Sequence, residues 1–173
     1  MQDWLAFACL IGAIMTLIAL SVIDLRVRLL PDKLVLIFAI LGVCFHIVSD
    51  WAYFQPEDII LGAAIGFGIL YGIRFVANRL YGQDALGLGD VKLLAAAGLW
   101  LAVDGVLAAM TLGALFGLLH GLLAAFYTAI KTRRRPNLSR LEVPAGPGFA
   151  LGIIAIGIYQ FGFHQTGFPW PGR

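Results

Sequence analysis

The stretch VKLLAAAGLWLAVDGVLAAMTLGALFGLLHGLLAAFYTAI, residues 91–130, decides the fold class of this chain. It is apolar over almost its whole length. It is also too long for one membrane span, because a helix crosses the hydrocarbon core with about 20 apolar residues. Asp104 and Gly105 interrupt it. We therefore predict a short membrane helix over residues 91–103, a break at Asp104-Gly105, and a longer helix after the break.

The composition of the whole chain agrees with a membrane protein. Of its 173 residues, 61% are hydrophobic and 13% are charged, whereas soluble domains are about half apolar and about a quarter charged. We predict an all-α, polytopic membrane bundle that forms a single transmembrane domain over residues 1–173. A net charge of +2 is too small to indicate nucleic-acid binding, so the expected surroundings are a lipid bilayer and no nucleic acid.

Other apolar runs complete a prediction of six transmembrane helices. A helix satisfies its own backbone polar groups inside lipid, so each run is expected to be helical. These runs cover residues 4–23, 34–48, 59–77 and 147–163. The first run lacks a basic segment before it and a small-residue cleavage site after it, so we interpret it as a retained span and not a signal peptide.

Basic residues predict the orientation of the bundle, because cytoplasmic loops carry an excess of Lys and Arg. Of the 12 basic residues, all except Arg173 follow the first, third or fifth predicted span. They are Arg26, Arg28, Lys33, Arg74, Arg79, Lys92, Lys131, Arg133, Arg134, Arg135 and Arg140. We therefore predict an N-out, C-out topology with these three loops in the cytoplasm. Four tryptophans near the predicted outer boundary agree with it: Trp4, Trp51, Trp100 and Trp170.

Glycines recur at four-residue spacing in three of the predicted helices. The sets are Gly62/Gly66, Gly68/Gly72, Gly113/Gly117/Gly121 and Gly148/Gly152. This spacing lets the backbones of membrane helices approach closely, although glycine is common in such helices in any case. Because several sets occur, we expect a compact bundle.

Cysteine and histidine give no indication of a metal centre. Cys9 and Cys44 lie in separate apolar runs without CxxC spacing, so we predict buried free thiols and neither zinc ligands nor a disulfide. His46, His120 and His164 are scattered and lack a partner four residues away. We expect no metal and no cofactor.

Two aspartates stand at the ends of predicted spans on the same side of the membrane. Asp90 lies in LGLGDVKLL, residues 86–94, and Asp24 lies in VIDLRVRLLPDKL, residues 22–34. An ionisable side chain at membrane depth marks a candidate functional site. A simpler explanation stays open, in which Asp90 only caps the following helix and Asp24 is only a boundary charge near arginines.

The residues around Asp90 indicate a chemical role for the pair. Gly87 and Gly89 allow positive φ and close backbone approach, and Asp90 is expected near the N-cap of the next helix. Two carboxyl groups about 3 Å apart cannot both ionise, so they share one proton. One takes a proton from water while the other polarises a carbonyl, which is aspartic-protease chemistry. This hypothesis requires the first and fourth predicted helices to be neighbours.

Two segments carry a resemblance to a known family. LYGQDALGLGDVKLLAAAGLWL resembles the second catalytic segment of the type IV prepilin peptidases, which are polytopic aspartic proteases of the bacterial inner membrane with a GxGD motif. IDLRVRLLPDKL resembles their first catalytic segment. The matching residues are Gly87, Gly89, Asp90 and Lys92 in one segment, and Asp24, Arg26, Pro31 and Asp32 in the other. The resemblance implies that Asp24 and Asp90 are the catalytic carboxylates.

A third segment, VPAGPGFALG, is similar to the family's Pro-x-Gly-Pro segment and matches it at Pro144, Gly146 and Pro147. Ala145 stands where the family often has an aromatic residue. For Lys92 we favour extension of the side chain to the cytoplasmic boundary or structural support, with the holding of a carboxylate as the alternative.

The resemblance implies an activity and a substrate. The family removes the short basic leader from prepilins or pseudopilins at the cytoplasmic face, before an apolar helix that could rest against glycine-lined faces such as those of Gly113 and Gly117. Larger members carry CxxC zinc ligands and an N-methyltransferase activity, so this chain is expected to be a short form with peptidase activity alone. Two alternatives stay open: a non-catalytic scaffold or transporter subunit of a pilus or secretion assembly, and a GxGD protease for other peptides.

Overall fold

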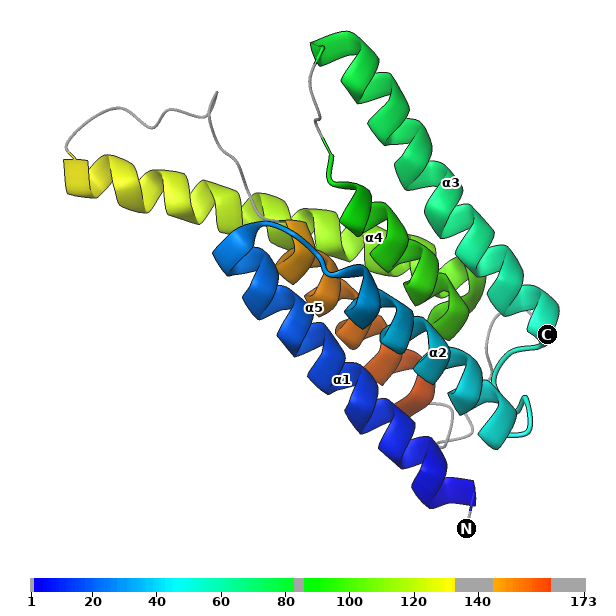
Figure 1. The fold of residues 1–173 in the computed structure, drawn as a ribbon. Coiled ribbons are helices and arrows are strands. Elements are labelled where there is room, and N and C mark those ends of the chain that lie inside the picture. Colours follow the sequence, from blue (N-terminus) through cyan, green and yellow to red (C-terminus); the bar gives the residue numbers. More distant parts are fainter. Residues whose placement is uncertain (1, 83–85, 133–144, 163–173) are drawn as a thin grey trace.

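The described residues of the computed structural model, 2–82, 86–132 and 145–162, are almost entirely helical, and no strand occurs among them. The elements are α1 (Gln2–Val27), α2 (Asp32–Val48), α3 (Pro56–Tyr81), α4 (Leu88–Thr132), α5 (Ala145–Gly157) and the π-helical turn η2 (Ile158–Gly162). Figure 1 shows their arrangement as a bundle. The predicted all-α fold is confirmed.

Four of the described helices are long and apolar enough to cross a membrane. They are Trp4–Val27, Pro56–Tyr81, Leu88–Tyr127 and Ala145–Gly162. Large apolar side chains such as Leu36 and Leu118 point outward, as expected where the solvent is lipid. The chain is therefore a multi-pass membrane protein. The count of six spans and the N-out, C-out orientation stay predictions.

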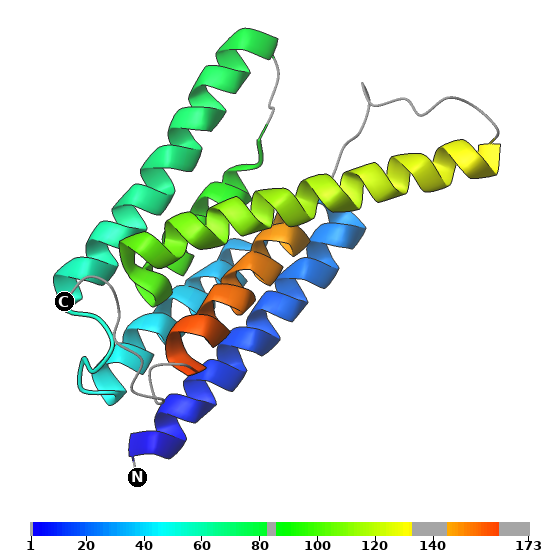
Figure 2. The same ribbon diagram turned by 180° about the vertical axis from the view of Figure 1, so that it is seen from behind.

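α4 consists of two helical segments joined at Ala102. This residue has φ 54° and ψ −164°, a conformation that glycine adopts far more readily than alanine. Figures 1 and 2 show the segments before and after this point running in different directions. The predicted break at Asp104-Gly105 is therefore misplaced, because the chain turns just before those residues and Asp104 is already helical.

Side chains from other helices satisfy the backbone where α4 turns. A break in helical φ and ψ interrupts the ladder of N–H to C=O bonds. His46 Nε2 on α2 lies 3.2 Å from the carbonyl oxygen of Trp100. Gln160 Nε2 in η2 donates to the carbonyl oxygen of Leu101 at 3.3 Å. Both polar side chains are buried, so they supply partners that lipid cannot.

The packing of α3 on α4 depends on two of the predicted glycines. A Cβ atom at Gly62 would lie 2.7 Å from the carbonyl oxygen of Gly98, and one at Gly66 would lie 2.6 Å from that of Leu94. Larger residues at either position would push the two backbones apart. The prediction of close approach is confirmed for this pair.

α5 approaches the second segment of α4 in the same way. A Cβ atom at Gly148 would lie 2.6 Å from the carbonyl oxygen of Gly113. Gly152 contacts the α4 backbone at the preceding turn. By contrast, a Cβ atom at Gly68 or Gly72 would meet nothing within 4 Å, so the prediction of close packing is wrong for that pair.

Trp100 is a core residue. It is 3% exposed, its ring centroid lies 5.6 Å from that of Phe38 and 5.4 Å from that of Phe45, and its Nε1 donates to the Phe38 carbonyl at 2.8 Å. Trp100 therefore packs inside the bundle, and its place near the outer boundary stays a prediction. Trp170 lies outside the described residues. The prediction that Cys44 is buried is wrong, because this residue is exposed on α2.

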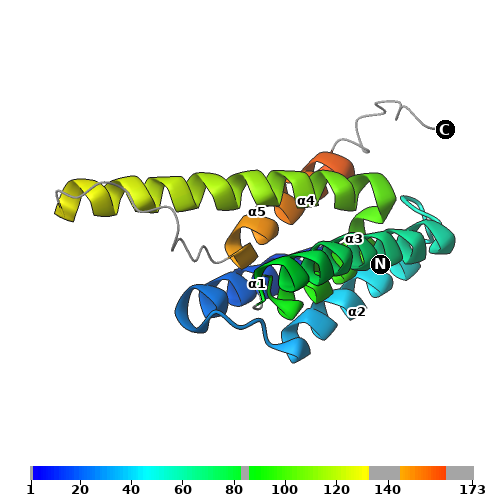
Figure 3. The same cartoon turned by 90° about the horizontal axis from the view of Figure 1, so that it is seen from above.

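The helix contacts determine what lies beside the first turn of α4. α4 packs against α3, α5 and α2, whereas α1 packs against α2 and α5. Figure 3 shows α5 and the second segment of α4 on one side of α1, α2 and α3. The predicted proximity of α1 and α4 is thus mediated chiefly by α2 and α5, which contact both helices.

Replacing Ala102 by glycine is expected to stabilise the fold by about 1 kcal/mol, because glycine adopts this backbone conformation without strain. Ala97→Gly is the matched control, since Ala97 is fully buried within a regular helical segment and its replacement should destabilise by about 1 kcal/mol. Thermal unfolding in detergent measures both. A lower melting temperature for both variants would contradict the assignment of strain at Ala102.

Candidate active site

Asp24 lies in the last turn of α1 and is 5% exposed. Its Oδ2 accepts a hydrogen bond of 3.0 Å from the backbone N–H of Gly146. Because α5 begins at Ala145, this N–H is one of the amides that a helix leaves without an internal partner. The N-terminus of a helix also favours negative charge. α5 therefore supplies both a donor and a favourable dipole to the carboxylate.

Position 146 accepts only glycine without rearrangement. A Cβ atom there would lie 2.6 Å from Asp24 Oδ2 and 2.9 Å from its Cγ. Pro147 follows within the first turn, where proline's missing N–H costs nothing. The resemblance thus selected a segment that contacts Asp24 directly. Pro144 lies outside the described residues.

Asp90 lies in the first turn of α4 and is 6% exposed. It is the third residue of the helix, which begins at Leu88, so its expected position near the N-cap is confirmed. Its Oδ1 is buried and has no hydrogen-bond partner among the described residues. The nearby helix N-terminus favours negative charge here as well.

The two carboxyl groups act on each other electrostatically. The charge of Asp24 opposes that of Asp90, while the guanidinium of Arg28 attracts Asp24. The start of α4 also meets the connection after α1, where a Cβ atom at Gly89 would lie 2.8 Å from that of Leu30. The two buried carboxyl groups therefore lie at the same end of the bundle. Carboxyl groups that come within hydrogen-bonding distance can share a proton and activate a water molecule.

The glycines before Asp90 act through close approach. Among the described glycines only Gly82 has a positive φ, of 66°, so Gly87 and Gly89 do not use the positive φ that glycine allows. A Cβ atom at Gly89 would lie 2.8 Å from that of Leu30, in the connection that follows α1. A Cβ atom at Gly87 would lie 3.1 Å from Asp90 Oδ2. The predicted close approach is confirmed, and it seats the first turn of α4 against this connection.

Lys92 holds a carboxylate, the alternative left open from the sequence. Its Nζ lies 2.8 Å from both carboxylate oxygens of Asp32, at the start of α2. Residues two apart on a helix do not share a face, so Lys92 points away from Asp90. The ion pair is partly exposed. It links the start of α2, just after Pro31, to the first turn of α4.

The arginine that acts on Asp24 is Arg28, and not Arg26, which the resemblance selected. Arg26 is exposed, and its two-residue offset from Asp24 directs it to another side of α1. Arg28 is the arginine whose charge acts on Asp24, and its backbone N–H donates to the Asp24 carbonyl at 2.9 Å. A four-residue spacing was the available signal for this pair.

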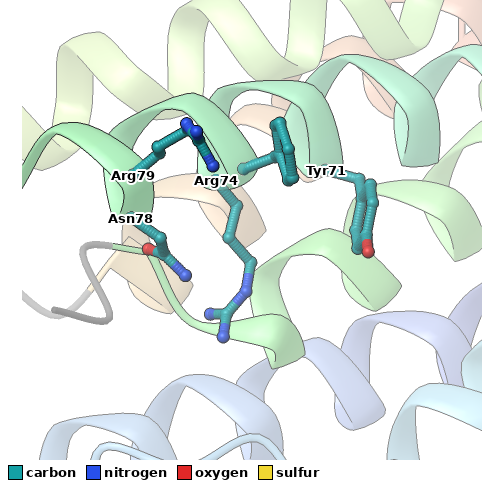
Figure 4. A pocket seen from close by; sticks show the side chains of 5 residues that line it. Tyr71, Arg74, Asn78 and Arg79 are labelled. Carbon is teal, nitrogen blue, oxygen red and sulfur yellow. The ribbon is translucent and has the colours of Figure 1, made fainter. Parts of the chain in front are cut away.

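Arg74 contacts the segment before Asp90, which the sequence did not indicate. Its Nη1 donates to the carbonyl oxygen of Leu86, the residue before Gly87. Figure 4 shows Arg74 and Asn78 on α3, bordering a cavity of about 320 Å³. Arg74 therefore fixes the chain immediately before the glycines of the site, over a distance in sequence that no local pattern reveals.

The described residues contain no cluster of three or more His, Cys, Asp or Glu side chains that would hold a metal ion. Together, the fold and the site define a multi-pass helical membrane protein with a buried pair of carboxyl groups. The model of the type IV leader peptidase family matches residues 5–134. The chain belongs to this family.

Individual relatives carry the name prepilin leader peptidase/N-methyltransferase. The chain is 35% identical over 135 residues to that of Xanthomonas campestris pv. campestris, covering 78% of this chain and 44% of the relative. It is 41% identical over 83 residues to the Escherichia coli (strain K12) protein, covering 48% of this chain and 36% of the relative. It is 34% identical over 141 residues to the Aeromonas salmonicida protein, covering 81% of this chain and 45% of the relative. The chain thus spans less than half of these relatives, and no solved structure matches it.

Replacing Gly146 by alanine is expected to reduce about 100-fold any catalytic activity that depends on Asp24, because the added methyl group displaces its carboxylate by a fraction of an ångström or more. Gly68→Ala is the control, since a Cβ atom there meets open space. Peptidase assays with a prepilin and melting temperatures of both variants would be measured in detergent. Full activity of a folded Gly146→Ala variant would show that the Gly146–Asp24 contact is dispensable.

Proposed function

We propose that this chain is an aspartic endopeptidase that removes the basic leader from type IV prepilins or pseudopilins, with Asp24 and Asp90 as its catalytic pair. The observation that carries the proposal is the burial of two mutually interacting carboxyl groups at the start of α4 and the end of α1. Membership of the type IV leader peptidase family supports the same activity.

The contacts suggest a division of roles within the pair. Asp24 Oδ2 accepts the Gly146 N–H, and an oxygen that accepts hydrogen bonds suits the group that takes a proton from the attacking water. Asp90 then carries the shared proton and polarises the scissile carbonyl. When the amide breaks, the proton taken from water passes to the leaving nitrogen, so the pair returns to its starting state.

Surrounding residues are proposed to support this pair. Gly146 and Pro147 hold Asp24 at the α5 N-terminus, and Gly89 seats the first turn of α4. The ion pair of Asp32 with Lys92 fixes the starts of α2 and α4 relative to each other. Gly87, Arg26, Pro31 and Pro144 belong to the same proposed surroundings.

The distribution of basic residues supports a site at the cytoplasmic face of the bacterial inner membrane. Arg26 lies in the last turn of α1 and Arg28 just after its end, close to Asp24 in sequence, and the positive-inside rule assigns such ends to the cytoplasm. A prepilin leader would be presented on that side. The substrates proposed here are prepilins or pseudopilins, and a single domain over residues 1–173 is proposed to act on them.

Asp24→Asn and Asp90→Asn are each expected to lower prepilin cleavage at least about 1,000-fold, because an amide cannot take part in the proton transfer. Asp104→Asn is the matched control, since this aspartate is exposed on the second segment of α4. Co-expression with a candidate prepilin, followed by a gel-shift assay, measures the loss. If the prepilin is processed equally well with either site variant and in cells that lack the chain, the chain is better explained as a non-catalytic scaffold or transporter subunit. If processing requires the chain but neither aspartate, the assignment of the catalytic pair is wrong.

The product of cleavage is expected to keep an unmethylated amino terminus. Residues 1–173 contain two cysteines and no CxxC pair, whereas the resemblance associates CxxC ligands with the methyltransferase. Mass spectrometry of a pilin processed by these residues, in cells without another prepilin peptidase, tests this. A mass increase of one methyl group at the new amino terminus would contradict the expectation.

A further inference from the structure

A second cavity, of about 460 Å³, lies between α1 and α5, with Phe38 of α2 and Trp100 of α4 among its lining residues. We call it the apolar groove and define it by Leu10, Ala13, Leu17, Ile153, Gly157 and Phe161. No charged side chain occurs among its described lining residues. The groove therefore suits an apolar occupant and excludes a basic peptide.

One wall of the groove leads along α1 to the carboxyl pair. Leu10, Ala13 and Leu17 are spaced by three and four residues, so they lie on one face of the helix. The same spacing continues through Leu20 to Asp24. At about 1.5 Å per residue, Leu17 lies about 10 Å from Asp24 along the helix axis and Leu10 about 21 Å.

The other wall leads along α5 to the same point. Gly146, which donates its N–H to Asp24, is followed on one helical face by Ala150, Ile153 and Gly157 at spacings of four, three and four residues. Ile153 and Gly157 line the apolar groove. Leu20 and Ala150, which stand between the groove and the site on these faces, are buried. The groove therefore lies on the same faces of α1 and α5 as the proposed active site, about two helical turns further along.

We propose that the apolar groove receives the mature apolar helix of the prepilin substrate, an inference that rests on the proposed function. A helix that starts at the scissile bond beside Asp24 and runs parallel to α1 reaches the depth of Leu17 after about seven residues and that of Leu10 after about 14. The groove therefore contacts the substrate between these two positions. The basic leader precedes the scissile bond, so it lies on the other side of Asp24 from the groove.

The glycine faces considered from the sequence do not offer the same room. A Cβ atom at Gly113 would lie 2.6 Å from the ring of Phe149, because α5 already packs there. At Gly157 the nearest atoms, in Phe161 and Leu101, would be 3.9 and 4.0 Å away. A Cβ atom at position 157 therefore makes only ordinary van der Waals contacts, and a larger side chain there would take up space at the apolar groove, which Gly157 lines.

The test compares Gly157→Leu with Gly72→Leu, a control that adds the same side chain where a Cβ atom meets open space on α3. Two substrates are used: a prepilin with its complete apolar helix, and the same leader followed by only six mature residues. We expect Gly157→Leu to raise KM for the complete prepilin about tenfold with kcat unchanged, the sign of lost binding. Cleavage of the short substrate should equal that of wild type, and Gly72→Leu should leave both substrates unaffected.

The outcomes separate the two proposals. If wild type cleaves neither substrate, the proposed function fails. If wild type cleaves both and Gly157→Leu leaves KM for the complete prepilin unchanged, the groove proposal fails. A loss of co-purified phospholipid with that result would assign the groove to an acyl chain. Equal losses on both substrates would also overturn the proposal, because they indicate a general structural effect.

A second measurement avoids any change to the apolar groove. A photo-reactive residue is placed ten positions after the scissile bond of the prepilin, and the substrate is held by the Asp24→Asn variant. Mass spectrometry is expected to map the cross-link to residues 10–17 of α1 or 153–162 of α5 and η2. A cross-link to the face of α3 that carries Gly68 and Gly72 would contradict the proposal.

Discussion

The hydrogen bond from the Gly146 amide to the Asp24 carboxylate is the contact on which the site and much of the bundle depend. A charged group removed from water without a partner costs several kcal/mol, and an apolar bundle offers few donors. α5 meets this need because the N–H of Gly146, in its first turn, has no partner within the helix and points at Asp24. The same helix lies on α4 through Gly148 and Gly152. One short helix therefore positions a carboxylate on α1 and, at the same time, contacts the helix that carries Asp90.

Much of this arrangement follows from local sequence signals. The length and apolarity of the runs predict membrane helices, and the interruption at Asp104-Gly105 indicates, to within a few residues, where α4 turns. The resemblance selects Asp24 and Gly146, which are in direct contact, and Asp90, which is buried in the first turn of α4. These signals succeed because each depends on a short segment: the period of a helix, the length of a span or a compact motif.

The remaining features depend on contacts between distant segments, which a single sequence does not contain. α4 turns at Ala102, although alanine has no intrinsic preference for positive φ. His46 and Gln160 support the turn, and they are 54 and 59 residues away from the carbonyls they contact. Trp100 looks like a boundary residue until α2 packs over it. Lys92 and Asp32, 60 residues apart, pair because Gly89 lets their helices start close together.

The turn at Ala102 also sets the rotational register of Asp90. A single residue joins the two segments of α4, so no flexible connection absorbs a change in length between that turn and the aspartate. Inserting or deleting one residue in this interval would rotate the carboxyl group by about 100° around the helix axis and shift it by about 1.5 Å, away from its counterpart on α1. The geometry thus constrains the number of residues between Asp90 and Ala102 more tightly than it constrains which amino acids most of them are.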